Sequence, residues 1–142
     1  MSHRSPAQSF LALGTIFAGT AVAAGAFGAH ALKTILDAHS LQVFETAVRY
    51  QMHHAVGLCI VSWAMERYPA QRLNQTGWLF TIGTVLFSGS LYIVSLTGIR
   101  WMGAITPLGG LAFLAGWLLF GWRVWQGTLD AIGGNSGMRD TR

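Results

Sequence analysis

Four long stretches without a charged side chain constrain this sequence more than any other feature. They cover residues 5–32, 50–65, 73–99 and 101–122. A helix crosses the roughly 30 Å apolar core of a bilayer with about 20 mostly apolar residues. Only 10% of the residues are charged, whereas soluble domains carry roughly 25%. So few charges cannot cover a water-facing surface, and the sequence therefore predicts an integral membrane protein.

The predicted fold class is all-α, a polytopic membrane protein that forms a four-transmembrane-helix bundle. One membrane domain is expected over residues 1–126, followed by a polar, mobile tail over 127–142. The first stretch also has features of a secretory signal, but its apolar part is longer than a usual signal core, so we expect a retained span. The expected spans cover about residues 8–30, 41–67, 74–97 and 107–125.

The second helix must be longer than its uncharged stretch. Sixteen residues at 1.5 Å per residue reach about 24 Å, which is too short for the bilayer core. We therefore expect a long amphipathic entry that begins at Ser40, a good N-cap residue. The helix should end near Arg67, because Pro69 disfavours its continuation. Thr106 and Pro107 similarly predict the start of the fourth helix.

The charges indicate topology rather than nucleic-acid binding. The net charge is +4, but the basic residues lie at the ends of apolar stretches and form no patch. An even number of spans puts both termini on one side, with Lys33, Arg49 and Arg100 on the other. Because basic residues are enriched on the cytoplasmic side, both termini are predicted to be cytoplasmic. Six arginines support this prediction: Arg4, Arg67, Arg72, Arg123, Arg139 and Arg142.

Five polar side chains near the end of the first span and the start of the second form the candidate site. Polar groups within a bilayer are costly, so they usually face other helices and find partners. The cluster would suit a metal, haem, quinone or lipid, or it would be a hydrogen-bonded network that joins two helices. No zinc-type spacing accompanies it, and the sequence identifies no cofactor. Its members are His30, Glu45, Tyr50, Gln51 and His54.

Small residues predict close helix packing. Glycine, alanine and serine let the backbones of neighbouring membrane helices approach closely. The same faces would serve packing within the domain or contact with a second protein. Ser88, Ser90 and Tyr92 add a second polar patch in the third span. The predicted packing residues are Gly25, Gly28, Ser88, Gly89, Ser90, Pro107, Gly109 and Gly110.

Several of these residues lie in segments that carry a family resemblance. In order, the segments resemble the YgdD-like family of small inner-membrane proteins, over about residues 10–122. The resemblance implies four membrane helices and the bacterial inner membrane, but it implies no activity and no catalytic residue. The segments are GAFGAHAL at 25–32, YQMHHA at 50–55, LFSGSLY at 86–92, TPLGG at 106–110 and GW at 116–117.

Three functional hypotheses fit the sequence. The first is a structural or accessory subunit of a membrane complex, since no complete catalytic set is visible and helix faces rich in small residues suit a partner or a second copy. The second is a membrane-embedded binding module built on the candidate site. The third is a small transporter, which is disfavoured because Glu45 and Glu66 lie near helix ends rather than deep in a span. The bilayer is the expected surrounding in every case.

Overall fold

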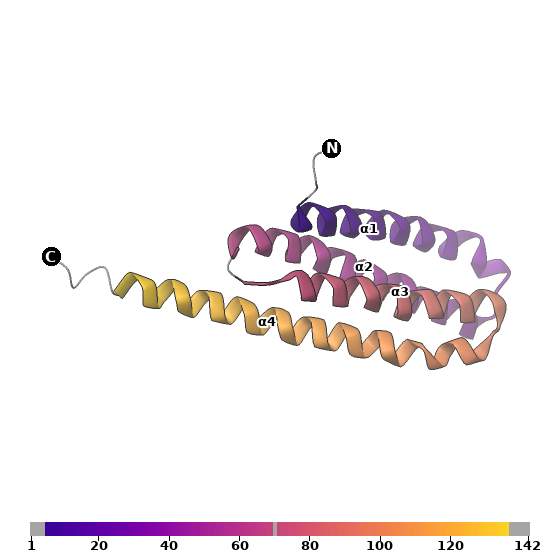
Figure 1. The fold of residues 1–142 in the computed structure, drawn as a ribbon. Coiled ribbons are helices and arrows are strands. Elements are labelled where there is room, and N and C mark those ends of the chain that lie inside the picture. The colour runs from indigo at the N-terminus through magenta and orange to yellow at the C-terminus, as the bar shows by residue number, and fades with distance from the viewer. Residues whose placement is uncertain (1–4, 70, 137–142) are drawn as a thin grey trace.

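The computed structural model describes residues 5–69 and 71–136, and residues 130–136 by their backbone alone. Four long helices follow one another along the chain (Figure 1), which confirms the all-α, four-helix fold. The first three are α1 (Pro6–His30), α2 (Ala38–Arg67) and α3 (Asn74–Thr97). The fourth is α4 (Thr106–Ser136). Short 3-10 turns, η1 (Leu32–Thr34) and η2 (Arg100–Ala104), precede α2 and α4.

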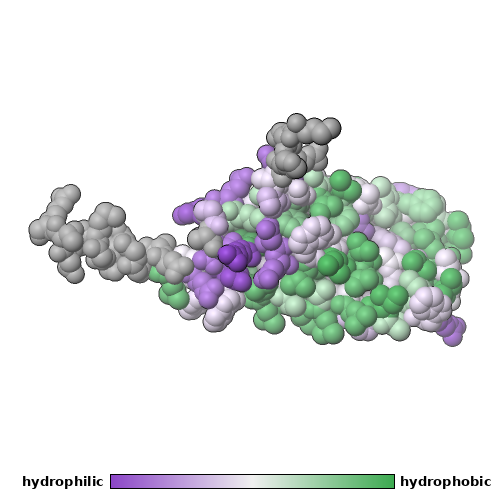
Figure 2. Space-filling model, viewed as in Figure 1, coloured by the Kyte–Doolittle hydropathy of each residue, from purple (hydrophilic) through white to green (hydrophobic). Residues whose placement is uncertain are grey.

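Three helical segments of the described chain are long and apolar enough to cross a membrane. They are Pro6–Thr34, Asn74–Thr97 and Arg100–Leu129. α2 is not among them, because its polar entry and charged ends lower its mean hydropathy. It lies between α1 and α3 (Figure 1) and packs against both. Figure 2 shows the corresponding surface, with apolar side chains across the middle and hydrophilic ones gathered near the α2–α3 connection.

The starts of α1 and α2 follow local capping chemistry. The Ser5 hydroxyl accepts from the backbone N–H of Gln8, whose side chain accepts in turn from the Ser5 N–H. α2 begins at Ala38, where the carboxylate of Asp37 accepts from two backbone N–H groups. The expected cap at Ser40 is therefore wrong. Asp37 takes that role because its side-chain oxygens reach the free N–H groups of the first turn, and the Ser40 hydroxyl itself donates to Asp37.

α4 continues to Ser136, past Gly127 where the polar tail was expected. At Gly127 the helix still packs on the α2–α3 connection, since an added Cβ would lie 3.3 Å from the Tyr68 ring. The Thr128 hydroxyl also donates to the Val124 carbonyl within the helix. These contacts give the helix support at the position where sequence composition alone indicates an end. Residues 137–142 of the expected tail lie outside the described residues.

The helices pack in an open row rather than a closed square. α1 packs on α2, α2 on α3 and α3 on α4, whereas α1 barely reaches α3 and α2 barely reaches α4. Among the described residues, α1 and α4 share no contact. The core therefore follows the row, and it includes Phe10, Leu58, Val61, Leu73, Phe80 and Phe113.

Phenylalanine rings packed on glycines of neighbouring helices hold the row together. The Phe10 ring of α1 lies so close to Gly77 of α3 that an added Cβ would come within 2.5 Å of it. Such contacts let two helix backbones approach closely, because only one of the two helices contributes a large side chain. The same pairing recurs for Phe44 with Gly28, Phe80 with Gly57 and Gly116, Phe87 with Gly109, and Phe113 with Gly83.

Candidate functional site

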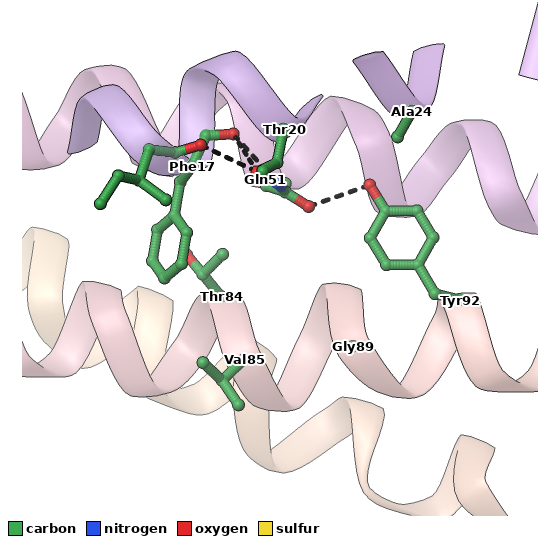
Figure 3. Close-up of a pocket in the computed structure, with 9 residues that line it drawn as sticks. Phe17, Thr20, Ala24, Gln51, Thr84, Val85, Gly89 and Tyr92 are labelled. Carbon is green, nitrogen blue, oxygen red and sulfur yellow. Dashed lines mark hydrogen bonds between the residues drawn. The ribbon is translucent and has the colours of Figure 1, made fainter. Parts of the chain in front are cut away.

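Gln51 of α2 joins three helices through its side-chain amide. Its Nε2 donates to the Phe17 carbonyl at 2.9 Å and to the Thr20 hydroxyl at 2.7 Å, both on α1. Its Oε1 accepts from the Tyr92 hydroxyl of α3 at 2.9 Å. Figure 3 shows the amide between these partners. The side chain is 7% exposed, so a buried amide is satisfied by both neighbouring helices.

A groove lies beside this network, between α1 and α3, and Gln51 is one of the residues that line it (Figure 3). We call it the α1–α3 groove; its volume is about 420 Å³. Gly89 forms part of its wall, and a Cβ built there would meet nothing within 4 Å. The groove is therefore mostly apolar, and Gln51 is one of the few polar side chains in it. Its lining residues are Ile16, Phe17, Thr20, Ala24, Gln51, Thr84, Val85, Gly89 and Tyr92.

His54 has partners for both ring nitrogens. Its Nε2 lies 3.2 Å from Trp117 Nε1, and an indole nitrogen can only donate, so Nε2 is the acceptor. The proton is accordingly assigned to Nδ1, which donates to the Tyr50 carbonyl at 2.8 Å. The imidazole also stacks on the Phe113 ring, with centroids 3.3 Å apart and an interplanar angle of 7°. This arrangement leaves no ring lone pair for a metal ion or a haem iron.

An aromatic hollow of about 570 Å³ lies between α2 and α4 beside His54. The Tyr50 ring forms part of its wall, 4.5 Å from the Phe87 ring, and the side chain is 39% exposed. Among the described residues, no charged side chain lines the hollow, so it suits a neutral, lipid-soluble group. Its lining residues are Tyr50, His54, Phe87, Pro107, Gly110, Leu111, Phe113, Leu114 and Trp117.

The five predicted site residues are not brought into one cluster. Gln51 turns toward α1 and α3, whereas Tyr50 and His54 face α4. His30 is exposed at the end of α1, and Glu45 is exposed about two turns into α2. Among the described residues, no group of three or more His, Cys, Asp or Glu side chains could hold a metal ion. Positions 50 and 51 lie about 100° apart on a helix, which explains the division.

Most of the predicted packing residues lie at helix contacts. Gly28 lies against Phe44, and Gly109 lies against Phe87. The hydroxyls of Ser90 and Thr106 are 2.7 Å apart and join α3 to α4. Gly25 packs loosely on Val48, and Gly110 packs loosely on Phe87. Ser88 is buried, with no partner for its hydroxyl, and Pro107 lines the aromatic hollow. A Cβ added at Gly89 would meet nothing within 4 Å.

Sequence reasoning did not place Thr20, Tyr92 or Trp117 at the site. Tyr92 and Trp117 lie in the segments LFSGSLY and GW, so their position in those segments was the available signal. Thr20 had no such signal, because a threonine in an apolar helix usually bonds to its own backbone, as Thr20 also does with the Ile16 carbonyl.

Comparison with known proteins relates this chain to bacterial membrane proteins. Residues 24–110 match the family model described as "Protein of unknown function (DUF423)". The UPF0382 membrane protein SH2409 of Staphylococcus haemolyticus is 48% identical over 110 residues, which cover 78% of this chain and 89% of that protein. The UPF0382 membrane protein YwdK of Bacillus subtilis is 48% identical over 111 residues, 78% of this chain and 90% of that protein. No solved structure matches.

Proposed function

This chain belongs to the DUF423 family of membrane proteins, and on that premise we propose that it is an accessory subunit that docks a transmembrane helix of another membrane protein in its α1–α3 groove. It is an integral membrane protein built from four helices. The family description supplies no reaction, so the proposal rests on how the helices are arranged.

The open row of helices is the observation that carries the proposal. α1, α2 and α3 surround the α1–α3 groove on three sides, as three members of a four-helix bundle would. A fourth helix from another protein would complete that arrangement. Gly89 leaves room for a close backbone approach, which membrane helices use in place of a hydrophobic driving force. The Gln51 network holds the two walls of the groove at a fixed separation.

We also propose three properties that were expected from the sequence. The chain would belong to the YgdD-like family, lie in the bacterial inner membrane and have both termini in the cytoplasm. The described basic residues do not by themselves favour one orientation, because Arg67, Arg72 and Arg123 lie toward the end with both termini whereas Lys33, Arg49 and Arg100 lie toward the other end. Arg4, Arg139 and Arg142 lie outside the described residues. The relatives are bacterial membrane proteins, which agrees with a plasma-membrane location.

Co-purification at natural abundance tests the docking proposal. Protein gently extracted from its own host is weighed by native mass spectrometry, as wild type and as Gly89→Leu. We expect a protein partner on the wild type and its loss from the variant, because the leucine side chain fills the groove. Leucine has the better helix propensity, so the variant should still fold.

Gly121→Leu is the matched control. Gly121 is also a helical glycine with nothing within 4 Å of an added Cβ, but it lies on α4 away from the groove. This variant should keep the partner. A wild-type protein that carries no stoichiometric protein partner contradicts the docking proposal, and so does equal loss from both variants.

A second candidate function is binding of a lipid-soluble ring compound, such as a quinone, in the aromatic hollow. The observation that favours it is Tyr50, which lines the hollow and whose hydroxyl has no hydrogen-bond partner among the described residues. Metal and haem are disfavoured because both nitrogens of His54 are engaged. Solvent extraction of purified protein should release a quinone from wild type and less from Tyr50→Phe. Equal amounts from both would contradict this function.

A further inference from the structure

We propose that a second hollow between α2 and α4 binds an anionic phospholipid. This lipid hollow lies toward the end of the molecule that carries both termini, has a volume of about 410 Å³, and is separate from both sites described above. Its walls include Ile60, Trp63, Tyr68, Phe120, Gly121 and Trp125.

The shape of the lipid hollow suits a lipid that lies along the membrane normal. α2 and α4 run in the same direction, because each is antiparallel to α3 (Figure 1). Ile60 and Phe120 therefore lie deeper in the bilayer, and Tyr68 and Thr128 lie nearer its surface. Trp63 is 61% exposed, a position typical of tryptophan at the boundary of the membrane. An acyl chain fits the deep part of this hollow and a headgroup fits its outer end.

The Arg67 side chain puts a positive charge at that outer end. Its guanidinium lies over the Tyr68 ring, 5.3 Å from its centre, and Tyr68 lines the hollow. Arg123 does not line the hollow, since it lies about 100° around α4 from the lining residue Val124. No carboxylate among the side chains that the structure describes is paired with Arg67.

A lipid phosphate would give the Arg67 guanidinium an anionic partner at this end. Guanidinium groups bind phosphate oxygens well because their donors match phosphate geometry. A lipid with a net negative headgroup is preferred over a zwitterionic one, since each basic residue near the surface contributes roughly fivefold in affinity for anionic lipid.

The test measures lipid retention on the full-length protein. Native mass spectrometry is performed with equimolar phosphatidylglycerol and phosphatidylcholine of identical acyl chains. Wild-type protein should retain phosphatidylglycerol at least about fivefold better. Arg67→Gln, which changes an exposed side chain, should reduce that preference about fivefold.

Two controls keep the test specific. Arg100→Gln removes an exposed charge at the opposite end and should leave the preference unchanged. Gly121→Leu fills the lipid hollow and should lower retention of both lipids, whereas Gly89→Leu should not. Equal retention of the two lipids by wild type overturns the proposal. So does an Arg67→Gln variant that behaves like Arg100→Gln.

Discussion

Gln51 shows how one polar side chain can organise a membrane domain. A hydrogen bond between membrane helices averages about 0.6 kcal/mol and reaches about 1.7 kcal/mol. Gln51 makes three such bonds, to Phe17, Thr20 and Tyr92. His54, three residues later, makes a separate bond to Trp117. Two neighbouring polar residues thus connect α2 with different helices, which a single binding cluster would not do.

Replacing Gln51 with leucine should destabilise the protein by about 1–3 kcal/mol, because the Tyr92 hydroxyl loses its buried acceptor. Unfolding in mixed micelles with increasing SDS measures the change. Tyr92→Phe should cost less, and the Gln51→Leu/Tyr92→Phe double variant should cost less than the sum of the two single ones. Strict additivity in this cycle would mean that the Gln51–Tyr92 hydrogen bond contributes no stability.

Asp37 makes the start of α2 sensitive to acid. Hydrogen bonds from the backbone and side chain of Ser40 hold the pKa of Asp37 below its ordinary value of 3.8. A lowered folded-state pKa contributes stability that is present above the ordinary value and is lost as the pH falls through the lowered one. We therefore expect wild type to lose stability below about pH 4 more steeply than Asp37→Asn. Unfolding titrations of both proteins between pH 6 and pH 3 check this, and parallel curves would contradict it.

At the scale of elements, the phenylalanine–glycine contacts predict opposite effects for similar substitutions. Gly77→Ala would put a Cβ within 2.5 Å of the Phe10 ring, so it should destabilise the protein by about 1–3 kcal/mol. Gly89→Ala meets nothing within 4 Å and should stabilise α3 by up to about 1 kcal/mol through helix propensity. Unfolding of both variants in SDS gives the two values. Equal destabilisation would mean that loss of glycine itself, and not the Phe10 contact, is responsible.

The elements also show which features the sequence could predict. α3 begins at Asn74 and ends before Gly98 because its stop signal is local, and Gly98 has a positive φ of 71°. The start of α2 was missed since Asp37 and Ser40 are both good caps and only geometry distinguishes them. α4 continues past Gly127, where it packs beside Tyr68, and no local sequence pattern encodes that contact. The polar site residues were identifiable, but the helix that each one faces depends on packing.

At the scale of the whole molecule, an open row and a closed bundle differ in the pairs of helices that pack against each other. A closed four-helix bundle would place α1 beside α4, whereas the described residues of these helices share no contact. α1 and α4 therefore present broad apolar faces, including Val22 and Leu114, both 63% exposed. Lipid or another protein must cover these faces, and the α1–α3 groove is open only as long as the row remains open.

Cysteine cross-linking in native membranes distinguishes the two arrangements. In a Cys59→Ser background, Val22→Cys with Leu114→Cys should give no cross-link within one chain when treated with a short bismaleimide. Ser90→Cys with Thr106→Cys is the positive control, because the hydroxyls at these positions are 2.7 Å apart, and it should cross-link readily. The mass of the product separates links within one chain from links between two copies. An α1–α4 link within one chain would mean that the bundle closes in the membrane, and a closed bundle would leave no place for the docked helix.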